Sequence, residues 1–244
     1  MPFSSAQPVP LEPAMVARLG KRRSVRTNSR VPPRSFLKDR AYERIKHRLL
    51  NDEYPPGSCL SERRLAEELG MSKTPVKAAL ERLGSEGFIS VSPQQGIVVR
   101  ELSIREIADQ YEIRAALESY TLRTLAGKLT PEQVARVRAN LQAQARLRGS
   151  GDVAAGMELD AAFHIQFAEF LGNREILRVI VQLREKMQRV AARVFRLCPA
   201  RIDASYDEHA AIAAAVIDGD GNRAAELIVQ HLELGKRLIL SPRG

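Results

Sequence analysis

The 244-residue sequence has few of the features that mark membrane, secreted or disulfide-stabilised proteins. The longest candidate apolar run, AAIAAAV at residues 210–216, is far shorter than the roughly 20 residues that a membrane-spanning helix needs. The N-terminus has no apolar segment of the kind found in secretory signals. Only two cysteines occur, Cys59 and Cys198, and their separation fits no metal motif. We therefore expect a cytoplasmic protein with no membrane segment and no structural disulfide.

Positive charge is concentrated at one end of the chain. The formal net charge is +9, and residues 1–35 hold seven Lys or Arg residues against one acidic residue, together with six prolines. Residues 36–104 and 105–244 carry excesses of only one and two positive charges. A basic, proline-rich segment without apolar periodicity predicts a disordered tail over residues 1–35. Such a tail either attracts phosphates without regard to sequence or is a solvated extension.

The first predicted domain, residues 36–101, contains three short helices followed by a hairpin. Apolar residues at helical spacing predict the first helix over residues 36–50. Serines suited to N-caps and glycines suited to helix C-termini delimit two further helices, at about 61–70 and 72–87. Alternating β-branched residues on both sides of Ser-Pro-Gln-Gln-Gly (92–96) predict the hairpin.

This order of elements predicts a winged helix-turn-helix, a DNA-binding domain whose second motif helix enters the major groove. Hydroxyl and ammonium groups at the start of that helix suit phosphate oxygens and guanine edges, and arginines on the preceding helix suit the DNA backbone. A small helical domain with ordinary surface lysines is the alternative. The candidate DNA-contacting residues are Arg63, Arg64, Ser72, Lys73, Thr74, Lys77, Gln95 and Gly96.

The second predicted domain, residues 102–240, shows helical patterns only. Ser103 with Glu106 and Thr130 with Gln133 form capping boxes that begin two helices. Further helices are expected over 153–171, over 174–197, from the pair Ser205 and Glu208 to Gly219, and over 222–239. The predicted fold class is mainly α: a winged helix-turn-helix of three helices plus a β-hairpin, followed by an all-α effector domain of six to seven helices.

Only four histidines occur in the chain, and three of them lie in apolar surroundings within the helical domain. Asp160 precedes His164 by four residues, which places both side chains on one helix face. His209 and His231 lie on the last two predicted helices. If these helices face one another, they join one carboxylate and three imidazoles, a ligand set that suits Zn²⁺, Ni²⁺, Mn²⁺ or Fe²⁺. Hydrogen-bonded core histidines are the alternative.

The stretch LSERRLAEELGMSKTPVKAALERLGSEGFISVSPQQGIVV resembles the winged-helix signature of the GntR superfamily, from about Ala41 to Val99. The resemblance implies a homodimer that reads a short palindrome in double-stranded DNA. Lys73 and Lys77 stand where the family usually has arginine. Because lysine is a point charge and not a bidentate fork, we expect the preferred bases to differ from those usual in the family. The DNA-contacting positions implied by the family are Arg63, Ser72, Lys73, Thr74, Lys77 and Gly96.

Three segments of the helical domain, EIRAALESYTLRTLA, LDAAFHIQFAEFLGN and DEHAAIAAAVIDGDGNRAAELIVQH, resemble the FCD effector domain. The resemblance implies that a small carboxylate effector completes the coordination of a bound divalent transition metal. It also implies that Arg114 holds the effector carboxylate, and it matches Asn173 to a recurrent asparagine. An ion pair between Arg114 and Glu118, and capping by Asn173, are the alternatives. The implied metal ligands are Asp160, His164, His209 and His231.

Taken together, these features predict a transcription regulator, most simply a repressor, whose operator affinity responds to an effector bound at a metal-containing pocket. A metal-dependent enzyme that uses the Asp/His₃ site is one alternative. The motifs contain no obvious additional acid to act as a general base, and the DNA-binding module favours sensing. A direct metal sensor, in which the ion itself is the signal, is the other alternative.

Overall fold

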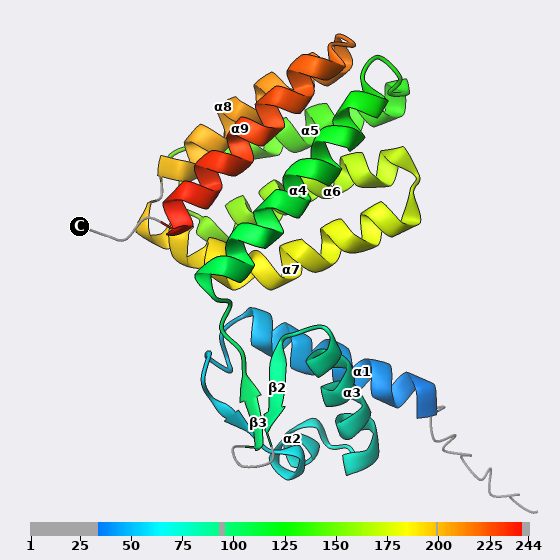
Figure 1. Cartoon of the computed structure of the whole chain (residues 1–244), viewed down its shortest axis with the longest axis vertical. Coiled ribbons are helices and arrows are strands. Elements are labelled where there is room, and N and C mark those ends of the chain that lie inside the picture. The colour runs from blue at the N-terminus through cyan, green and yellow to red at the C-terminus, as the bar shows by residue number, and fades with distance from the viewer. Residues whose placement is uncertain (1–33, 93–95, 199, 241–244) are drawn as a thin grey trace, which may run out of the picture. The chain divides into compact units, whose positions relative to one another are not determined.

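The computed structural model describes residues 34–92, 96–198 and 200–240 of the protein (Figure 1). Within these ranges, three helices and a small sheet are followed by a set of helices, which confirms the predicted mainly α fold class. No helix in the described part of the chain is long and apolar enough to cross a membrane. The predicted tail, apart from Arg34 and Ser35, lies outside the described residues. These two residues belong to the first helix.

Helices α1 (Arg34–Leu50), α2 (Glu62–Leu69) and α3 (Lys73–Ser85) surround one apolar core. Gly70 ends α2 in the left-handed conformation (φ 62°), so the chain turns sharply into α3, as the sequence predicts. The apolar stripes predicted for these helices are buried. Their core residues include Ala41, Ile45, Leu49, Leu65, Leu69, Val76, Ala79, Leu80 and Leu83.

The predicted hairpin is formed by β2 (Ile89–Ser92) and β3 (Gly96–Val99), which are antiparallel with Ile89 opposite Val99. A further strand, β1 (Cys59–Leu60), pairs with the other edge of β3 and gives the order β1-β3-β2. The sequence did not indicate β1 because two residues carry no periodicity. Ile89 and Val99 are buried and close one side of the helical core.

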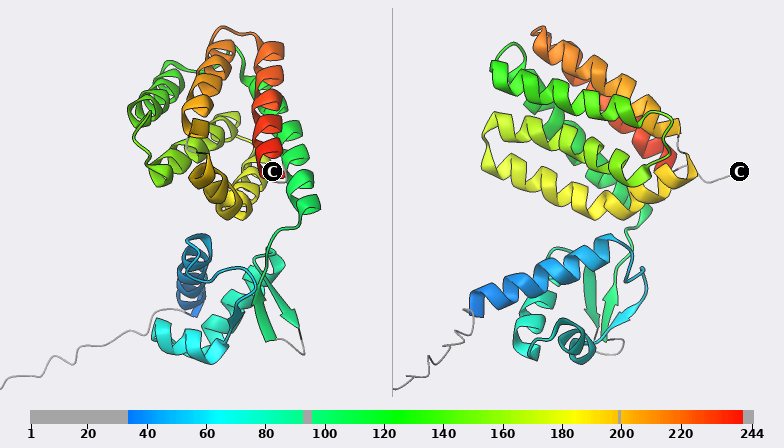
Figure 2. Two further views of the ribbon diagram at one scale, coloured as in Figure 1. Left: turned by 90° about the vertical axis from the view of Figure 1, so that its left-hand side faces the viewer. Right: turned by 180° about the vertical axis from the view of Figure 1, so that it is seen from behind.

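The remaining described helices cover the second predicted domain and pack around a second apolar core. α4 lies along α9, and α6 packs against both α5 and α7 (Figure 2). The two predicted capping boxes, at the starts of α4 and α5, are both present. Phe163, Ile212 and Ile228 lie at the centre of the core. The bounds are α4 (Ile104–Leu125), α5 (Pro131–Leu147), α6 (Val153–Leu171), α7 (Arg174–Leu197), α8 (Ala200–Ile217) and α9 (Gly221–Leu240).

One predicted helix start is wrong. We expected Ser205 and Glu208 to begin a helix, but α8 begins at Ala200 and Ser205 is buried within it. The Ser-x-x-Glu spacing makes no cap here because Ser205 already lies in the second turn of α8. The Glu208 carboxylate is bound instead by Arg201 and His231. This placement directs Glu208 towards the candidate site.

Candidate metal centre and DNA-binding surface

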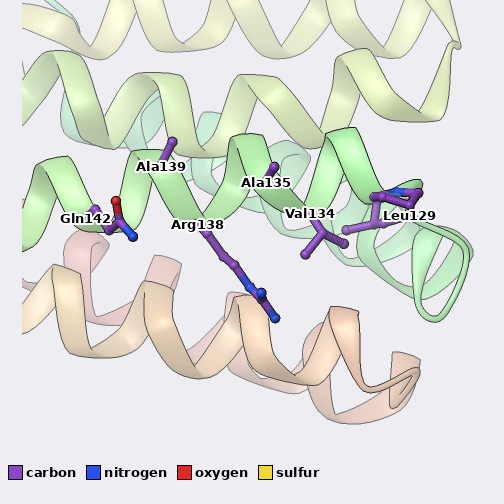
Figure 3. A pocket seen from close by; sticks show the side chains of 7 residues that line it. Leu129, Val134, Ala135, Arg138, Ala139 and Gln142 are labelled. Atoms are coloured by element: carbon purple, nitrogen blue, oxygen red, sulfur yellow. The ribbon is translucent and has the colours of Figure 1, made fainter.

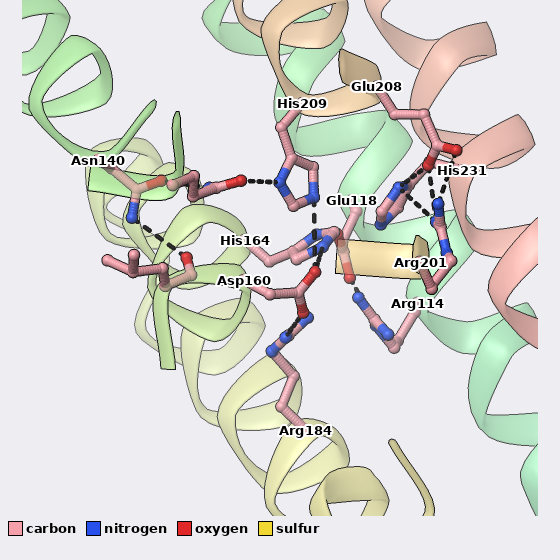
Figure 4. A network of polar contacts seen from close by, with 12 residues as sticks. Arg114, Glu118, Asn140, Asp160, His164, Arg184, Arg201, Glu208, His209 and His231 are labelled. Carbon is pink, nitrogen blue, oxygen red and sulfur yellow. Dashed lines mark hydrogen bonds and ion pairs between the residues drawn. The ribbon is translucent and has the colours of Figure 1, made fainter. Parts of the chain in front are cut away.

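The four predicted metal ligands come together inside the second domain (Figure 4). Asp160 and His164 lie on α6, His209 on α8 and His231 on α9. One potential ligand atom from each residue lies within 4.8 Å of those of the other three. The three histidines are buried and Asp160 is largely buried. The i,i+4 spacing on α6 and the packing of three helices together produce this cluster.

Each imidazole is held through its Nδ1 atom by a polar side chain from another helix. Such contacts orient the ring and leave the opposite nitrogen, Nε2, to face the centre of the cluster. The three contacts are His164 Nδ1 to Glu118 Oε2 at 2.5 Å, His209 Nδ1 to Gln144 Oε1 at 2.9 Å, and His231 Nδ1 to Glu208 Oε2 at 2.5 Å.

The hydrogen-bond network around His209 determines which nitrogen carries the proton. Asn140 Nδ2 donates to the Leu159 carbonyl at 3.1 Å, and a carbonyl oxygen can only accept. Asn140 Oδ1 therefore accepts from Gln144 Nε2 at 2.7 Å, which leaves Gln144 Oε1 as an acceptor. His209 Nδ1 must donate to that oxygen, so the lone pair of the ring is on Nε2 (Figure 4). This is the tautomer that a metal ligand requires.

The Nε2 atoms of two of the histidines face a carboxylate oxygen. His164 Nε2 and His209 Nε2 lie 3.9 Å and 3.6 Å from Asp160 Oδ1. Both nitrogens are buried, and neither has a hydrogen-bond partner among the described residues. Buried polar atoms normally have a hydrogen-bond partner. Acceptors that face one another cannot bond to each other, because none of them carries a proton to donate. A cation between them would satisfy all three, so the residues present fit a divalent metal ion.

The protonation states suit the same role. Burial, followed by the charge of Arg184, lowers the pKa of His164 well below its usual range. Burial, followed by the electrostatic interaction with His231, also lowers the pKa of His209 well below its usual range. Burial alone would raise the pKa of Asp160, but Arg184 and the histidines outweigh it and hold that pKa below its usual value. Near neutral pH the site therefore combines neutral imidazoles at His164 and His209 with an ionised carboxylate at Asp160.

A cavity of about 450 Å³ adjoins the cluster, within the range usual for small-molecule sites. Asp160, His164 and His231 line it, together with three arginines. Each arginine is paired with one acid. Arg114 Nε donates to Glu118 Oε1 at 2.8 Å, Arg184 donates to Asp160, and Arg201 makes a bidentate pair with Glu208 at 2.7 Å.

Of the two residues predicted to bind an effector, one lines this cavity. Arg114 is buried there and also forms the ion pair with Glu118 that we considered as an alternative. Asn173 is exposed and does not line the cavity. Its Oδ1 accepts from the backbone N–H groups of Glu175 and Ile176 at 3.0 and 3.2 Å, which is a cap at the start of α7.

From the sequence we considered Arg114 and Glu118 as an ion pair, but we assigned no residue the role of orienting a metal ligand. Asn140 with Gln144 is a second i,i+4 pair, whose shared helix face could have been noticed. Arg184 has no comparable signal, because its partner Asp160 lies on another helix. The contacts that reach a candidate ligand join residues 23 to 65 positions apart, from His231 with Glu208 to His209 with Gln144, so they depend on helix packing.

The predicted DNA-contacting residues lie on exposed parts of the first domain. Ser72, Lys73, Thr74 and Lys77 are exposed at the start of α3, whose opposite face is buried. Side chains of Arg63 and Arg64 are 78% and 80% exposed on α2, each beside a glutamate one turn further on. Exposed pairs of this kind are weak, so both guanidinium groups can turn to phosphates. Gly96 is exposed with φ 74°, and Gln95 lies outside the described residues.

A second hollow lies along one face of α5, where Leu129, Val134, Arg138 and Gln142 line it (Figure 3). It shares no lining residue with the cavity beside the metal ligands. Arg138 is the single ionisable side chain among its described lining residues. A shallow surface with one charge offers no set of metal ligands, so we take the cavity beside the four candidate ligands as the candidate site.

Gln144→Leu tests the orienting role of the amide. Leucine cannot accept from His209 Nδ1, so we expect the affinity for Zn²⁺ to fall about 10–100-fold. Competition against a chelating dye measures this affinity. Gln142→Leu, an exposed position on the same helix, is the matched control and should bind Zn²⁺ as the unchanged protein does. Equal affinities in both variants would contradict the role assigned to Gln144.

Two family models match the chain in succession. Residues 37–99 match the model described as bacterial regulatory proteins, gntR family, and residues 109–234 match the FCD domain. The Nta operon transcriptional regulator of Aminobacter aminovorans is 29% identical over 182 residues, which cover 74% of this chain and 83% of that protein. An uncharacterized HTH-type transcriptional regulator in an unstable DNA locus of Streptomyces ambofaciens is 30% identical over 193 residues, 78% of this chain and 80% of that one.

A solved structure supports the same fold. E. coli McbR/YncC superposes with a TM-score of 0.72 at 24% identity, over 83% of this chain and 96% of that one. The matched families and the similar curated proteins are regulators of transcription, which excludes the enzyme that we considered as an alternative. With a DNA-binding domain and a helical domain matched in this order, the chain belongs to the GntR family of bacterial transcription regulators and carries a C-terminal FCD domain.

Proposed function

We propose that this regulator binds a palindromic operator as a homodimer in the cytoplasm, and that a small carboxylate and a divalent transition metal in the FCD domain control its operator affinity. The observation that carries the proposal is the pair of buried, unpartnered Nε2 atoms of His164 and His209 facing Asp160 beside an arginine-lined cavity. Asp160, His164, His209 and His231 would hold the ion, which would supply coordination positions for carboxylate oxygens.

Control of this kind requires only a modest energetic difference. A ligand that favours one arrangement of the two DNA-reading domains by ~1–3 kcal/mol changes DNA affinity about 5–150-fold. Both domains of a homodimer must reach half-sites at a fixed spacing, so a small change in their separation is sufficient. For a repressor, effector binding weakens the complex with the operator.

The exposed residues at the start of α3 support the DNA-reading part of the proposal. Lys73, Thr74 and Lys77 share one exposed edge of a helix whose other side is anchored in the core. A helix held in this way can enter the major groove without rearrangement. Arg63 and Arg64 would then bind phosphates, which orient the protein without reading the sequence.

The regulatory prediction is tested on a DNA duplex that the unchanged protein selects from a randomised pool. With Zn²⁺ bound, we expect a carboxylate from a panel of organic and sugar acids to change the affinity about 5–150-fold, measured by fluorescence anisotropy. If no carboxylate alters the affinity, the effector part is wrong. If Zn²⁺ alone changes it and carboxylates do not, the protein is a direct metal sensor.

His209→Ala tests the metal site, because it removes one ligand and leaves the DNA-binding domain intact. We expect the purified variant to lose bound metal and its response to carboxylates, with operator binding retained. Metal content by mass spectrometry and thermal unfolding are the measurements. His47→Ala, at the exposed fourth histidine, is the control and should keep its metal. If His209→Ala does not fold, Asp160→Asn tests the same site, because asparagine has nearly the same shape as aspartate. Full metal content in both folded variants would exclude the site.

Lys77→Ala tests the recognition surface. Because Lys77 is exposed, we expect the free energy of unfolding to stay unchanged and specific DNA affinity to fall about 5–150-fold, equivalent to ~1–3 kcal/mol. Lys128→Ala, an exposed lysine in the FCD domain, is the control. The assignment fails if the Lys77 and Lys128 variants bind the selected duplex equally well.

A further inference from the structure

We propose that the cavity beside the metal ligands takes a monocarboxylate with an apolar body, aliphatic or aromatic, in preference to a di- or tricarboxylate. This inference rests on the proposed function and names the chemical class of its ligand. Its basis is a separation of polar from apolar side chains along the three helices that line most of the cavity.

The polar end of the cavity is rich in hydrogen-bond donors. Arg114 and Arg184 line it with side chains that are only 7% and 11% exposed. Arg114 Nη2, and Arg184 Nε and Nη1, have no acceptor among the described residues. Guanidinium groups donate and do not accept, so the missing partner is an acceptor. A carboxylate is the acceptor that best matches such groups.

The charges around this end agree with an anion. Arg114, Arg184 and Arg201 are each already paired with one acid, namely Glu118, Asp160 and Glu208. A divalent ion bound beside these three balanced ion pairs would therefore leave an excess of positive charge in a buried region. A buried excess charge is costly unless it is compensated, which a ligand carboxylate achieves.

The other end of the cavity is apolar. On α6, the lining residues pass from His164 and Asp160 back to Met157 and Val153. At 1.5 Å per residue, Val153 lies about 16 Å from His164 along the helix axis. On α7, they pass from Arg184 to Met187, Ala191, Ala192 and Phe195, and on α9 from His231 to Leu232, Leu238 and Ile239. Apolar side chains therefore predominate at this end on all three helices, although Glu158 on α6 and Gln188 on α7 also line the cavity, as do Asn51 and Asp52.

This difference between the two ends of the cavity favours a monocarboxylate with an apolar body over a di- or tricarboxylate. A methyl, alkyl or aryl group against Met157, Ala191 and Phe195 would bury apolar surface and gain free energy from it. A second carboxylate in that region would lie mainly against apolar side chains, without a cationic partner among the described lining residues. Among the described side chains, the cationic residues that line the cavity all belong to the polar end, and Glu158 lines the cavity on α6 with a charge that repels a second anion.

Isothermal titration of the full, Zn²⁺-loaded chain with a ligand series tests the proposal. We expect affinity to rise from acetate through butyrate and hexanoate to octanoate, roughly fourfold per buried methylene, with benzoate well above acetate. Succinate and citrate should bind more weakly than octanoate. Hexanol should bind much more weakly than hexanoate. Tighter binding of succinate or citrate would overturn the proposed class, and equal binding of hexanol would overturn the carboxylate end.

A variant that fills the apolar end gives an independent test. Ala191→Leu adds bulk to the cavity on α7 without touching a metal ligand. We expect at least about tenfold weaker octanoate binding, with acetate binding and metal content unchanged. Ala139→Leu, exposed on α5 and outside this cavity, is the control and should bind octanoate normally. Unaltered octanoate binding by the Ala191 variant would contradict the placement of the ligand's apolar part at the apolar end of the cavity.

The direct titrations separate this inference from the proposed function. If octanoate or benzoate binds but DNA affinity does not change, the ligand class stands and the regulatory role fails. If DNA affinity responds to succinate or citrate but not to apolar monocarboxylates, the regulatory role stands and the ligand class fails. If no carboxylate binds to the Zn²⁺-loaded protein, both are wrong.

Discussion

The contact on which the second domain depends is the approach of the Asp160 carboxylate to the buried Nε2 atoms of His164 and His209. Three acceptors face one another there, and the described residues supply no donor between them. An apolar core would gain nothing from such an arrangement, because buried lone pairs without partners cost free energy. A cation at the centre would satisfy all three acceptors, and the surrounding contacts hold them in place for it.

Those surrounding contacts involve every helix of the domain. α6, α8 and α9 carry the four candidate ligands. α4 supplies Glu118, α5 supplies Gln144 and α7 supplies Arg184, and each holds a ligand directly. A change in coordination at the centre would therefore reach all six described helices of the domain. In a domain that is joined to a DNA-binding module, this gives ligand binding a physical route to the rest of the molecule.

Much of the fold could be predicted because its signals are local. The capping boxes at Ser103 and Thr130, and Gly70 at the end of α2, act through the backbone groups of neighbouring residues. The four candidate ligands were predicted from one i,i+4 pair, two isolated histidines and a family resemblance. The same local reasoning failed at Ser205, because α8 begins five residues earlier and the capping pattern lies inside the helix. Glu208 binds Arg201 and His231 instead.

The sequence by itself determined the helices, their caps, the turn into the recognition helix and the residue types available for a metal site, since these depend on spacing of a few residues. Only the tertiary structure decided that Gln144, held by Asn140, directs the proton of His209 to Nδ1. It also decided that Arg114 shares its carboxylate partner with His164, and that the cavity is polar at one end and apolar at the other. These properties arise where helices distant in sequence meet. Helical periodicity specifies which face of a helix is buried, but it does not specify which other helix packs against that face.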